Sequence, residues 1–171
     1  LSTMNTQFAK LNKQGIDAAE RGNMHEAEIF FRSAMQLNSN SYEATFNLIK
    51  LLHMNSRYHD AILTFYQIDN NILRSLPLHI VNILSDSAVK DQDMFTACEC
   101  CELLLNAFPE HVETACRFSN ILIKTGQLAK SRLVLNQSNL IKGGDPNLLT
   151  QLAITESELG NYSRSEEIHL E

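Results

Sequence analysis

Three of the four cysteines in this sequence stand within four consecutive residues, the most unusual local chemistry that it holds. They are Cys98, Cys100 and Cys101, and the fourth is Cys116. A disulfide framework spreads its cysteines more evenly. On a helix Cys98 and Cys101 share one face and Cys100 points elsewhere, so three thiolates cannot meet at one metal ion. We expect Cys101 to fill the core, and a redox or metal role together with Cys116 is the alternative.

Other patterns that would carry catalysis are missing from the sequence. Gly143-Gly144 lacks the Lys-Ser/Thr of a phosphate-binding loop, and neither a nucleophile elbow nor a His-Glu-x-x-His motif occurs. The six histidines show no spacing that would hold a metal on one helix face. We therefore predict no catalytic residue, no cofactor and no metal in this segment, which is then not an enzyme.

The composition is that of a folded protein, with 44% hydrophobic and 20% charged residues. The net charge is −6 and the basic residues are scattered, whereas a nucleic acid or an anionic membrane needs clustered Lys and Arg. No apolar run approaches the roughly 20 residues that span a bilayer. We predict no nucleic-acid partner and no membrane insertion. Unpaired thiols favour the cytoplasm, and a periplasmic or membrane-tethered location is the alternative for a fragment of a longer protein.

A small residue recurs at intervals of 34, 36, 34 and 34 residues, at Ala27, Ala61, Ala97, Ser131 and Ser165. Three residues before each stands a large residue: Met24, Tyr58, Met94, Leu128 and Tyr162. Five residues before each stand Gly22, Ser56, Gln92, Gly126 and Gly160. Four residues after each stand Phe31, Phe65, Cys101, Leu135 and His169. Four columns in register indicate an internal repeat.

Between these columns the sequence is typical of helices, because Gly and Pro are rare and apolar residues recur at three- and four-residue spacing. Asp145-Pro146 predicts the start of a helix, and Gly143-Gly144 supplies a residue with positive φ to close the previous one. Pro77 and Pro109 lie at boundaries between hairpins. Each repeat therefore predicts two antiparallel helices with a turn at the glycine column, stacked on its neighbours.

The spacing resembles the tetratricopeptide repeat. The first hairpin matches that pattern best, at Leu11, Gly15, Ala18, Gly22, Ala27, Phe31 and Ala34. The second matches at Phe46, Asn47, Leu48, Ala61 and Phe65. The third, with an insertion near residues 74–76, matches at Leu84, Ala88, Ala97 and Pro109. The fourth is degenerate and keeps Phe118, Leu122, Gly126 and Ser131. The fifth keeps Leu149, Leu152, Ala153 and Gly160.

This resemblance implies an all-α fold, a right-handed superhelical array (α-solenoid) of antiparallel helix hairpins. We expect a single repeat domain over residues 1–171, with hairpins at about 8–41, 42–75, 77–111, 112–144 and 145–171, the last incomplete. In such arrays the first helix of each hairpin lines a concave groove that binds peptides. Read onto this chain, the groove residues are Asn12, Ile16, Phe46, Asn47, Lys50, His53, Asn82, Asp86, Cys116, Asn120 and Ile123. The last hairpin adds Asn147, Thr150 and Ile154.

The side chains of this groove limit the ligand. Some members of the family bind a peptide carboxylate with a clamp of lysine, asparagine and arginine, but this chain has Asn12 and Ile16 where the clamp has Lys and Asn. We therefore set carboxylate capture aside. The amides Asn12, Asn82 and Asn120 can donate to and accept from the backbone of an extended peptide. The plainer alternative is that these residues form only a solvated surface.

The resemblance implies a protein-interaction scaffold or adaptor that holds a peptide or a helix of a partner. A first alternative is the recognition arm of a larger enzyme, such as a glycosyltransferase or sulfotransferase, with its catalytic domain outside this chain. A second is self-association into a homodimer, because the incomplete C-terminal hairpin lacks a polar capping helix.

Overall fold

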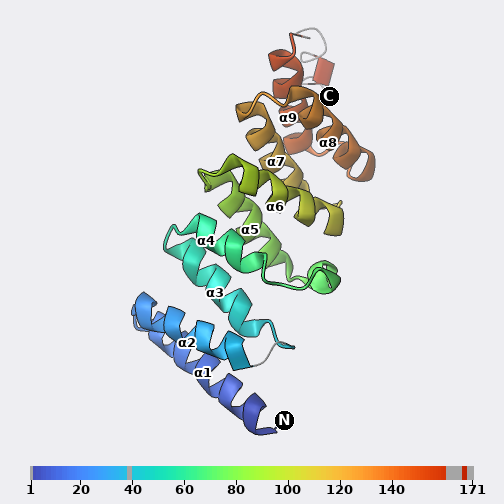
Figure 1. Cartoon of the computed structure of the whole chain (residues 1–171). Coiled ribbons are helices and arrows are strands. Elements are labelled where there is room, and N and C mark those ends of the chain that lie inside the picture. Colours follow the sequence, from blue (N-terminus) through green and yellow to red (C-terminus); the bar gives the residue numbers. More distant parts are fainter. Residues whose placement is uncertain (1, 38–39, 161–166, 169–171) are drawn as a thin grey trace. The chain divides into compact units, whose positions relative to one another are not determined.

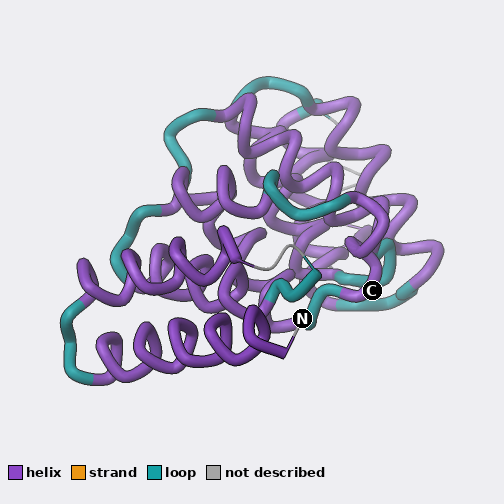
Figure 2. Tube along the Cα trace, turned by 60° about the horizontal axis from the view of Figure 1, so that its bottom comes forward, coloured by secondary structure: helices purple, strands orange, loops and turns teal. Residues whose placement is uncertain are grey.

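The computed structural model describes residues 2–37, 40–160 and 167–168 (Figure 1). In these ranges all regular structure is helical, and no strand is present (Figure 2). The chain divides into two compact units, residues 1–70 (unit 1) and residues 71–171 (unit 2). The single domain predicted over the whole chain stays a prediction.

Unit 1 contains two helix pairs. The first pair is α1 (Ser2–Glu20) with α2 (Met24–Leu37), and the second is α3 (Glu43–Met54) with α4 (Tyr58–Phe65). Helix α1 packs along α2, α2 on α3, and α3 on α4, while α1 also touches α3. Helix α1 begins upstream of residue 8, where the first hairpin is expected to start.

Unit 2 contains five α-helices in its described part. They are α5 (Leu78–Lys90), α6 (Met94–Ala107), α7 (Val112–Lys124), α8 (Leu128–Ile141) and α9 (Pro146–Glu158). Helix α5 packs on α6 and α7, and α9 packs on α7 and α8. A short 3-10 helix, η1 (Asn70–Ser75), precedes α5 at the insertion that the sequence shows near residues 74–76.

The small column of the repeat lies in the core. Ala27, Ala61, Ala97 and Ser131 have no exposed surface, and Ser165 lies outside the described residues. The following column is buried as well, at Phe31, Phe65, Cys101 and Leu135, and its last member, His169, lies outside the described residues. A side chain no larger than alanine or serine lets the second helix of a hairpin approach the first, and the large residue one turn later fills the space beside it.

Four members of the glycine column have a backbone in the left-handed region. These residues are Gly22 (φ 79°), Ser56 (φ 60°), Gly126 (φ 76°) and Gly160 (φ 82°). In the second turn the Ser56 amide donates to His53 O at 3.0 Å and the Arg57 amide to Leu52 O at 2.8 Å. This paired closure satisfies the last carbonyl groups of α3. Serine therefore adopts a backbone conformation that glycine takes without steric cost.

The third turn is built differently, which explains why Gln92 replaces glycine there. Asp91 is buried and has extended backbone (φ −71°, ψ 136°), and its Oδ1 accepts from the Asp93 amide at 3.0 Å. Asp93 then caps α6 by accepting from the Thr96 amide at 3.2 Å. Carboxylates replace the left-handed residue in this turn. As predicted, Asp145 caps α9, Pro146 follows as its first residue, and Gly144 has φ 81°.

A buried chain of hydroxyl groups joins α7, α8 and α9. Ser131 Oγ lies 2.8 Å from Ser119 Oγ and 2.9 Å from Thr155 Oγ1, and Thr155 Oγ1 donates to Gln151 O at 2.9 Å. Each hydroxyl therefore has a partner, so serine is tolerated where other repeats have alanine. The ion pair between Arg132 Nε and Glu156 Oε1, at 2.7 Å, links α8 and α9 nearby.

Candidate peptide-binding face

The predicted groove residues divide between the two units. In unit 1, Asn12 and Ile16 lie on α1, and Phe46, Asn47, Lys50 and His53 lie on α3. In unit 2, Asn82 and Asp86 lie on α5, and Cys116, Asn120 and Ile123 lie on α7. Helix α1 contacts α3, and α7 contacts both α5 and α9. Within each unit the structure therefore brings these residues together on adjacent first helices.

In unit 1 the two asparagines bind each other. Asn12 is only 4% exposed, and its Oδ1 accepts from Asn47 Nδ2 at 3.0 Å. Asn12 therefore lies inside the contact between α1 and α3, where its amide is not open to a ligand. The neighbouring Ile16 and Lys50 are half-buried.

Two half-buried rings of α3 have aromatic neighbours that the sequence prediction did not include. The Phe46 ring stacks on Tyr42 with centroids 6.4 Å apart and an interplanar angle of 26°. The His53 ring meets Tyr58 edge-on at 5.7 Å. These neighbours restrict the rings, so Phe46 and His53 offer ordered surfaces.

Arg117 organises the corresponding part of unit 2, and sequence reasoning missed it. Its Nη1 donates to Asn82 O at 3.1 Å, to Asn82 Oδ1 at 2.6 Å and to Ser85 Oγ at 2.8 Å. All three acceptors are uncharged and lie on α5. The half-buried Arg117 therefore joins α7 to α5 and fixes the Asn82 side chain.

Gln151 repeats this arrangement from α9. Its Nε2 donates to Asn120 Oδ1 at 2.6 Å and lies 3.4 Å from Cys116 O. Asn47, Arg117 and Gln151 share one place in the repeat, directly after Phe46, Cys116 and Thr150. Each binds a residue 35 positions earlier. A donor at this place in three hairpins is the sequence signal that could have revealed the pattern.

The remaining groups on the unit 2 side are an ion pair and a thiol. Asp86 Oδ2 lies 2.9 Å from Lys90 Nζ. Burial, and after it the carboxylates of Asp145 and Glu113, raises the pKa of Cys116 to about 11. The thiol is therefore neutral near pH 7 and acts as a small polarisable surface group.

The cysteine cluster lies mainly in the core. Cys100 and Cys101 have no exposed surface, and Cys98 is half-buried. Cys100 is buried against α5, where its Sγ lies 4.0 Å from Leu84 O. Burial raises the pKa of all three thiols. Across the part of the chain that the structure describes, no group of three His, Cys, Asp or Glu side chains is placed to hold a metal.

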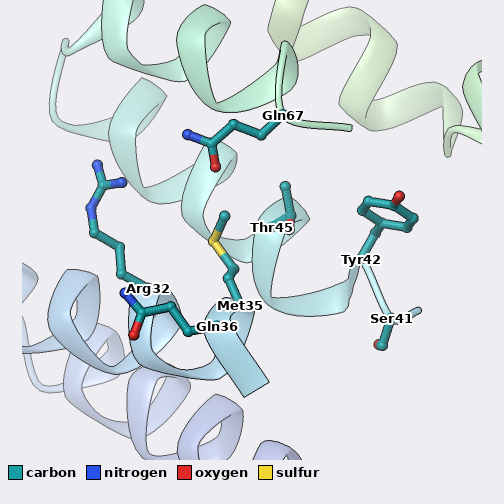
Figure 3. Close-up of a pocket in the computed structure, with 7 residues that line it drawn as sticks. All are labelled: Arg32, Met35, Gln36, Ser41, Tyr42, Thr45 and Gln67. Carbon is teal, nitrogen blue, oxygen red and sulfur yellow. The ribbon is translucent and has the colours of Figure 1, made fainter. Parts of the chain in front are cut away.

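A pocket of about 410 Å³ lies in unit 1, and none of the predicted groove residues is among those that line it (Figure 3). Met35 points between Arg32 and Thr45, and Gln67 approaches from the segment after α4 (Figure 3). The lining residues are Arg32, Met35, Gln36, Ser41, Tyr42, Thr45 and Gln67.

Arg32, the one cation among the described residues that line this pocket, already has a charged partner. Its Nη2 lies 2.9 Å from Glu28 Oε1, and Arg57 binds the same carboxylate through Oε2 at 2.5 Å. Burial alone would raise the pKa of Glu28, but hydrogen bonds from Arg57 and Arg32 outweigh it and lower the pKa. The Arg32 charge is therefore already matched and gives the pocket little power to select a charged ligand.

A second pocket, of about 440 Å³, lies between the second helices α6 and α8 of unit 2. Leu105 and Val134 line it, together with Phe118 of α7 and the exposed Leu133 and Ile141. Sequence reasoning from the first helices gave no indication of either pocket. No helix in the described ranges is both long and apolar enough to cross a membrane.

Comparison with known proteins supports the fold. No protein-family model and no curated protein matches the sequence. Among solved structures, the MamA protein has a TM-score of 0.74 at 12% identity, over 96% of this chain and 88% of that one. A tetratricopeptide repeat protein from Parabacteroides merdae ATCC 43184 has a TM-score of 0.69 at 17% identity, over 95% of this chain and 64% of that one.

YrrB, a TPR protein with an unusual peptide-binding site, has a TM-score of 0.66 at 15% identity, over 92% of this chain and 80% of that one. These similarities agree with the helical pairs and the buried small column described above. The helical repeat fold predicted from the columns is confirmed, and the chain has the fold of the tetratricopeptide repeat proteins.

Proposed function

We propose that the chain is a protein-interaction scaffold that binds a segment of a partner protein on the first helices of unit 2. We call this surface the unit 2 face. Its residues are Asn82, Asp86, Cys116, Asn120, Ile123, Asn147, Thr150 and Ile154, on α5, α7 and α9.

One observation carries the proposal. Two asparagines on this face are each held by a half-buried side chain of the neighbouring first helix. Arg117 holds Asn82, and Gln151 holds Asn120, each through a hydrogen bond of 2.6 Å. A side chain already held in one rotamer loses little conformational entropy when a ligand arrives.

Apolar contact is also available on the unit 2 face. Ile154 is 41% exposed on α9, and Ile123 is half-buried on α7. The asparagine amides can bond to the backbone of a peptide, and the isoleucines can contact its apolar side chains. This combination suits a peptide segment better than a small polar molecule. The peptide-binding site named for YrrB, which has the same fold, supports this proposal.

Site-specific photo-crosslinking tests the proposal. A photoreactive side chain at the exposed Thr150 lies on the unit 2 face, and one at the exposed Leu133 lies on the second helix α8. We expect a partner protein to be linked from Thr150 and not from Leu133 in cells of the source organism. We also expect Asn82→Ala to weaken that link while the thermal unfolding temperature stays nearly unchanged. Equal linking from both positions would contradict the proposal.

Unit 1 offers a separate candidate face, with Ile16, Phe46, Asn47, Lys50 and His53 as its candidate contacts. The stacked Phe46 ring is its largest apolar surface. Phe46→Ala should weaken binding of a partner that reaches unit 1, as measured by calorimetric titration. An unchanged affinity would confine the binding site to unit 2.

The two alternatives from the sequence stay predictions. The homodimer through the C-terminal hairpin involves residues 161–166 and 169–171, which lie outside the described residues. Sedimentation over a range of concentrations tests it, and a strict monomer would end the idea. The recognition arm of a larger enzyme is tested by the gene sequence on either side of this segment.

A further inference from the structure

We infer that the unit 2 face selects an extended, proline-rich segment, because its asparagines present N–H donors whose natural partners are carbonyl oxygens. This inference rests on the proposed function and specifies the class of partner. It follows from which end of each amide is already occupied within the chain.

The orientation of Asn82 is set by Arg117. A guanidinium has only donors, so the Asn82 atom that lies 2.6 Å from Arg117 Nη1 must be the oxygen. The backbone oxygen of Asn82 accepts from the same nitrogen at 3.1 Å. The NH2 group of Asn82 therefore points away from the guanidinium, and Asn82 is an exposed residue.

The orientation of Asn120 follows by the same logic in two steps. Cys116 O is an acceptor, so the Gln151 atom that lies 3.4 Å from it must be the nitrogen. Turning the Gln151 amide would set two oxygens against each other. Because Gln151 Nε2 also lies 2.6 Å from Asn120, the Asn120 atom at that contact is the oxygen. The NH2 group of Asn120 is therefore the part of the amide that does not take part in this contact.

The NH2 groups of Asn82 and Asn120 are therefore both able to donate to a ligand. Within the described part of the chain neither Asn82 Nδ2 nor Asn120 Nδ2 has a hydrogen-bond partner, while the oxygens of both are engaged. The carboxylate of Asp86 on the same face is paired with Lys90. A ligand carbonyl oxygen can therefore accept from either NH2 group, whereas a ligand N–H group meets amide oxygens that already accept a hydrogen bond within the chain.

This donor pattern favours an extended ligand over a helical one. The carbonyl groups inside an α-helix are bonded to its own amides, so they have little left to accept from Asn82 and Asn120. In a polyproline II segment no internal hydrogen bonds exist and the carbonyl groups are open to a partner.

Among extended ligands, a polyproline II segment suits these donors, because proline has no backbone N–H group that needs an acceptor on the face. Proline rings would pack on Ile123 and Ile154. Binding to the NH2 groups of Asn82 and Asn120 needs only the carbonyl groups of the ligand, so the missing N–H group of proline costs nothing.

A blocked oligoproline peptide of about ten residues is the probe, with a length-matched peptide that has alanine at every second position as the comparison. We expect the oligoproline to bind the full chain and to shift the side-chain NH2 resonances of Asn82 and Asn120 in ¹⁵N NMR spectra. The alanine-containing peptide should bind more weakly, and equal binding of the two peptides would contradict proline selection.

The double variant Asn82→Asp with Asn120→Asp keeps both acceptor oxygens for Arg117 and Gln151 and removes both donors. We expect it to weaken oligoproline binding about tenfold or more, because two hydrogen bonds are lost and carboxylates repel carbonyl oxygens. The control is Asn106→Asp with Asn136→Asp, which adds the same charge at exposed positions on α6 and α8 and should leave the affinity unchanged.

The outcomes separate this inference from the proposed function. If the alanine-containing peptide binds at the unit 2 face and the oligoproline does not, proline selection is wrong and peptide binding stands. If neither peptide binds, the inference is wrong, while the crosslink from Thr150 still decides whether a partner protein uses this face. Oligoproline binding that is as tight in the variant with Asn82→Asp and Asn120→Asp as in the original chain would also overturn the inference.

Discussion

Single side chains decide which hydrogen-bonding groups the unit 2 face presents, and the decisive ones are not the asparagines themselves. Arg117 and Gln151 each turn a neighbouring asparagine so that its NH2 group is left without a partner in the described part of the chain. The sequence predicted the asparagines as groove residues because their place in the repeat could be counted. It could not show which end of each amide is engaged, because that depends on a donor 31 or 35 residues away in another helix.

Ser56 holds a strained backbone conformation that a single substitution can relieve. Its φ is 60° where Gly22 and Gly126 stand in the equivalent turns. We expect Ser56→Gly to raise the free energy of unfolding by about 0.5–1 kcal/mol. Glycine avoids the cost of about 1–2 kcal/mol that a residue with a Cβ has in the left-handed region, and the greater freedom of glycine in the unfolded chain offsets part of this gain. Urea unfolding measures the change. Gly126→Ser is the matched reverse substitution and should lower stability, and a loss in both variants would contradict this explanation.

The four thiols should react in an order set by burial. We expect Cys98 and Cys116 to be alkylated before the fully buried Cys100 and Cys101, and urea to make all four equal. Because the pKa of Cys116 is raised to about 11, its rate should climb about tenfold per pH unit across the range from pH 7 to 10. Peptide mass spectrometry resolves each site, and a fast native reaction at Cys100 would show that α6 opens.

The same thiol links alkaline pH to stability. The folded pKa of Cys116 lies above its value of about 8.5 in an unfolded chain, so the unfolded state loses the proton first. Its stabilising contribution is complete below about pH 8.5 and is lost as the pH rises through about 11. The chain should therefore become easier to unfold in urea over this interval, and Cys116→Ser should reduce that pH dependence.

At the scale of helices, the sequence predicted the pairs well because turns and close contacts leave local signals. Glycine at a turn, proline at a boundary and a small residue at a contact each restrict the residue type at one position. The third turn carries no such signal in its column, since Asp91 and Asp93 replace the left-handed residue with side-chain hydrogen bonds. The hydroxyl chain through Ser131 was likewise hidden, because its three members come from three helices.

The approach of α1 to α2 depends on Gly15. A Cβ at this position would lie 2.5 Å from Cε1 of Phe31, so the ring must move. We expect Gly15→Ala to destabilise the chain by about 1–2 kcal/mol, since overpacking outweighs the better helix propensity of alanine. Phe31→Leu should cost about 1 kcal/mol alone. In the double variant the two losses should be less than additive when measured by urea unfolding, and strict additivity would show that the contact is not limiting.

At the scale of the whole chain, the division into two units suggests that the unit 2 face is self-sufficient. Asn82, Asn120 and the residues that orient them, Arg117 and Gln151, all belong to residues 71–171. We expect this segment alone to unfold cooperatively in circular dichroism and to bind the oligoproline probe within about threefold of the full chain, because no described residue of unit 1 takes part in fixing the amides. The same segment with Asn82→Asp and Asn120→Asp is the control for specific binding. A segment that folds but fails to bind would show that unit 1 supplies contacts of its own to the ligand, and Phe46→Ala in the full chain would then identify the first of them.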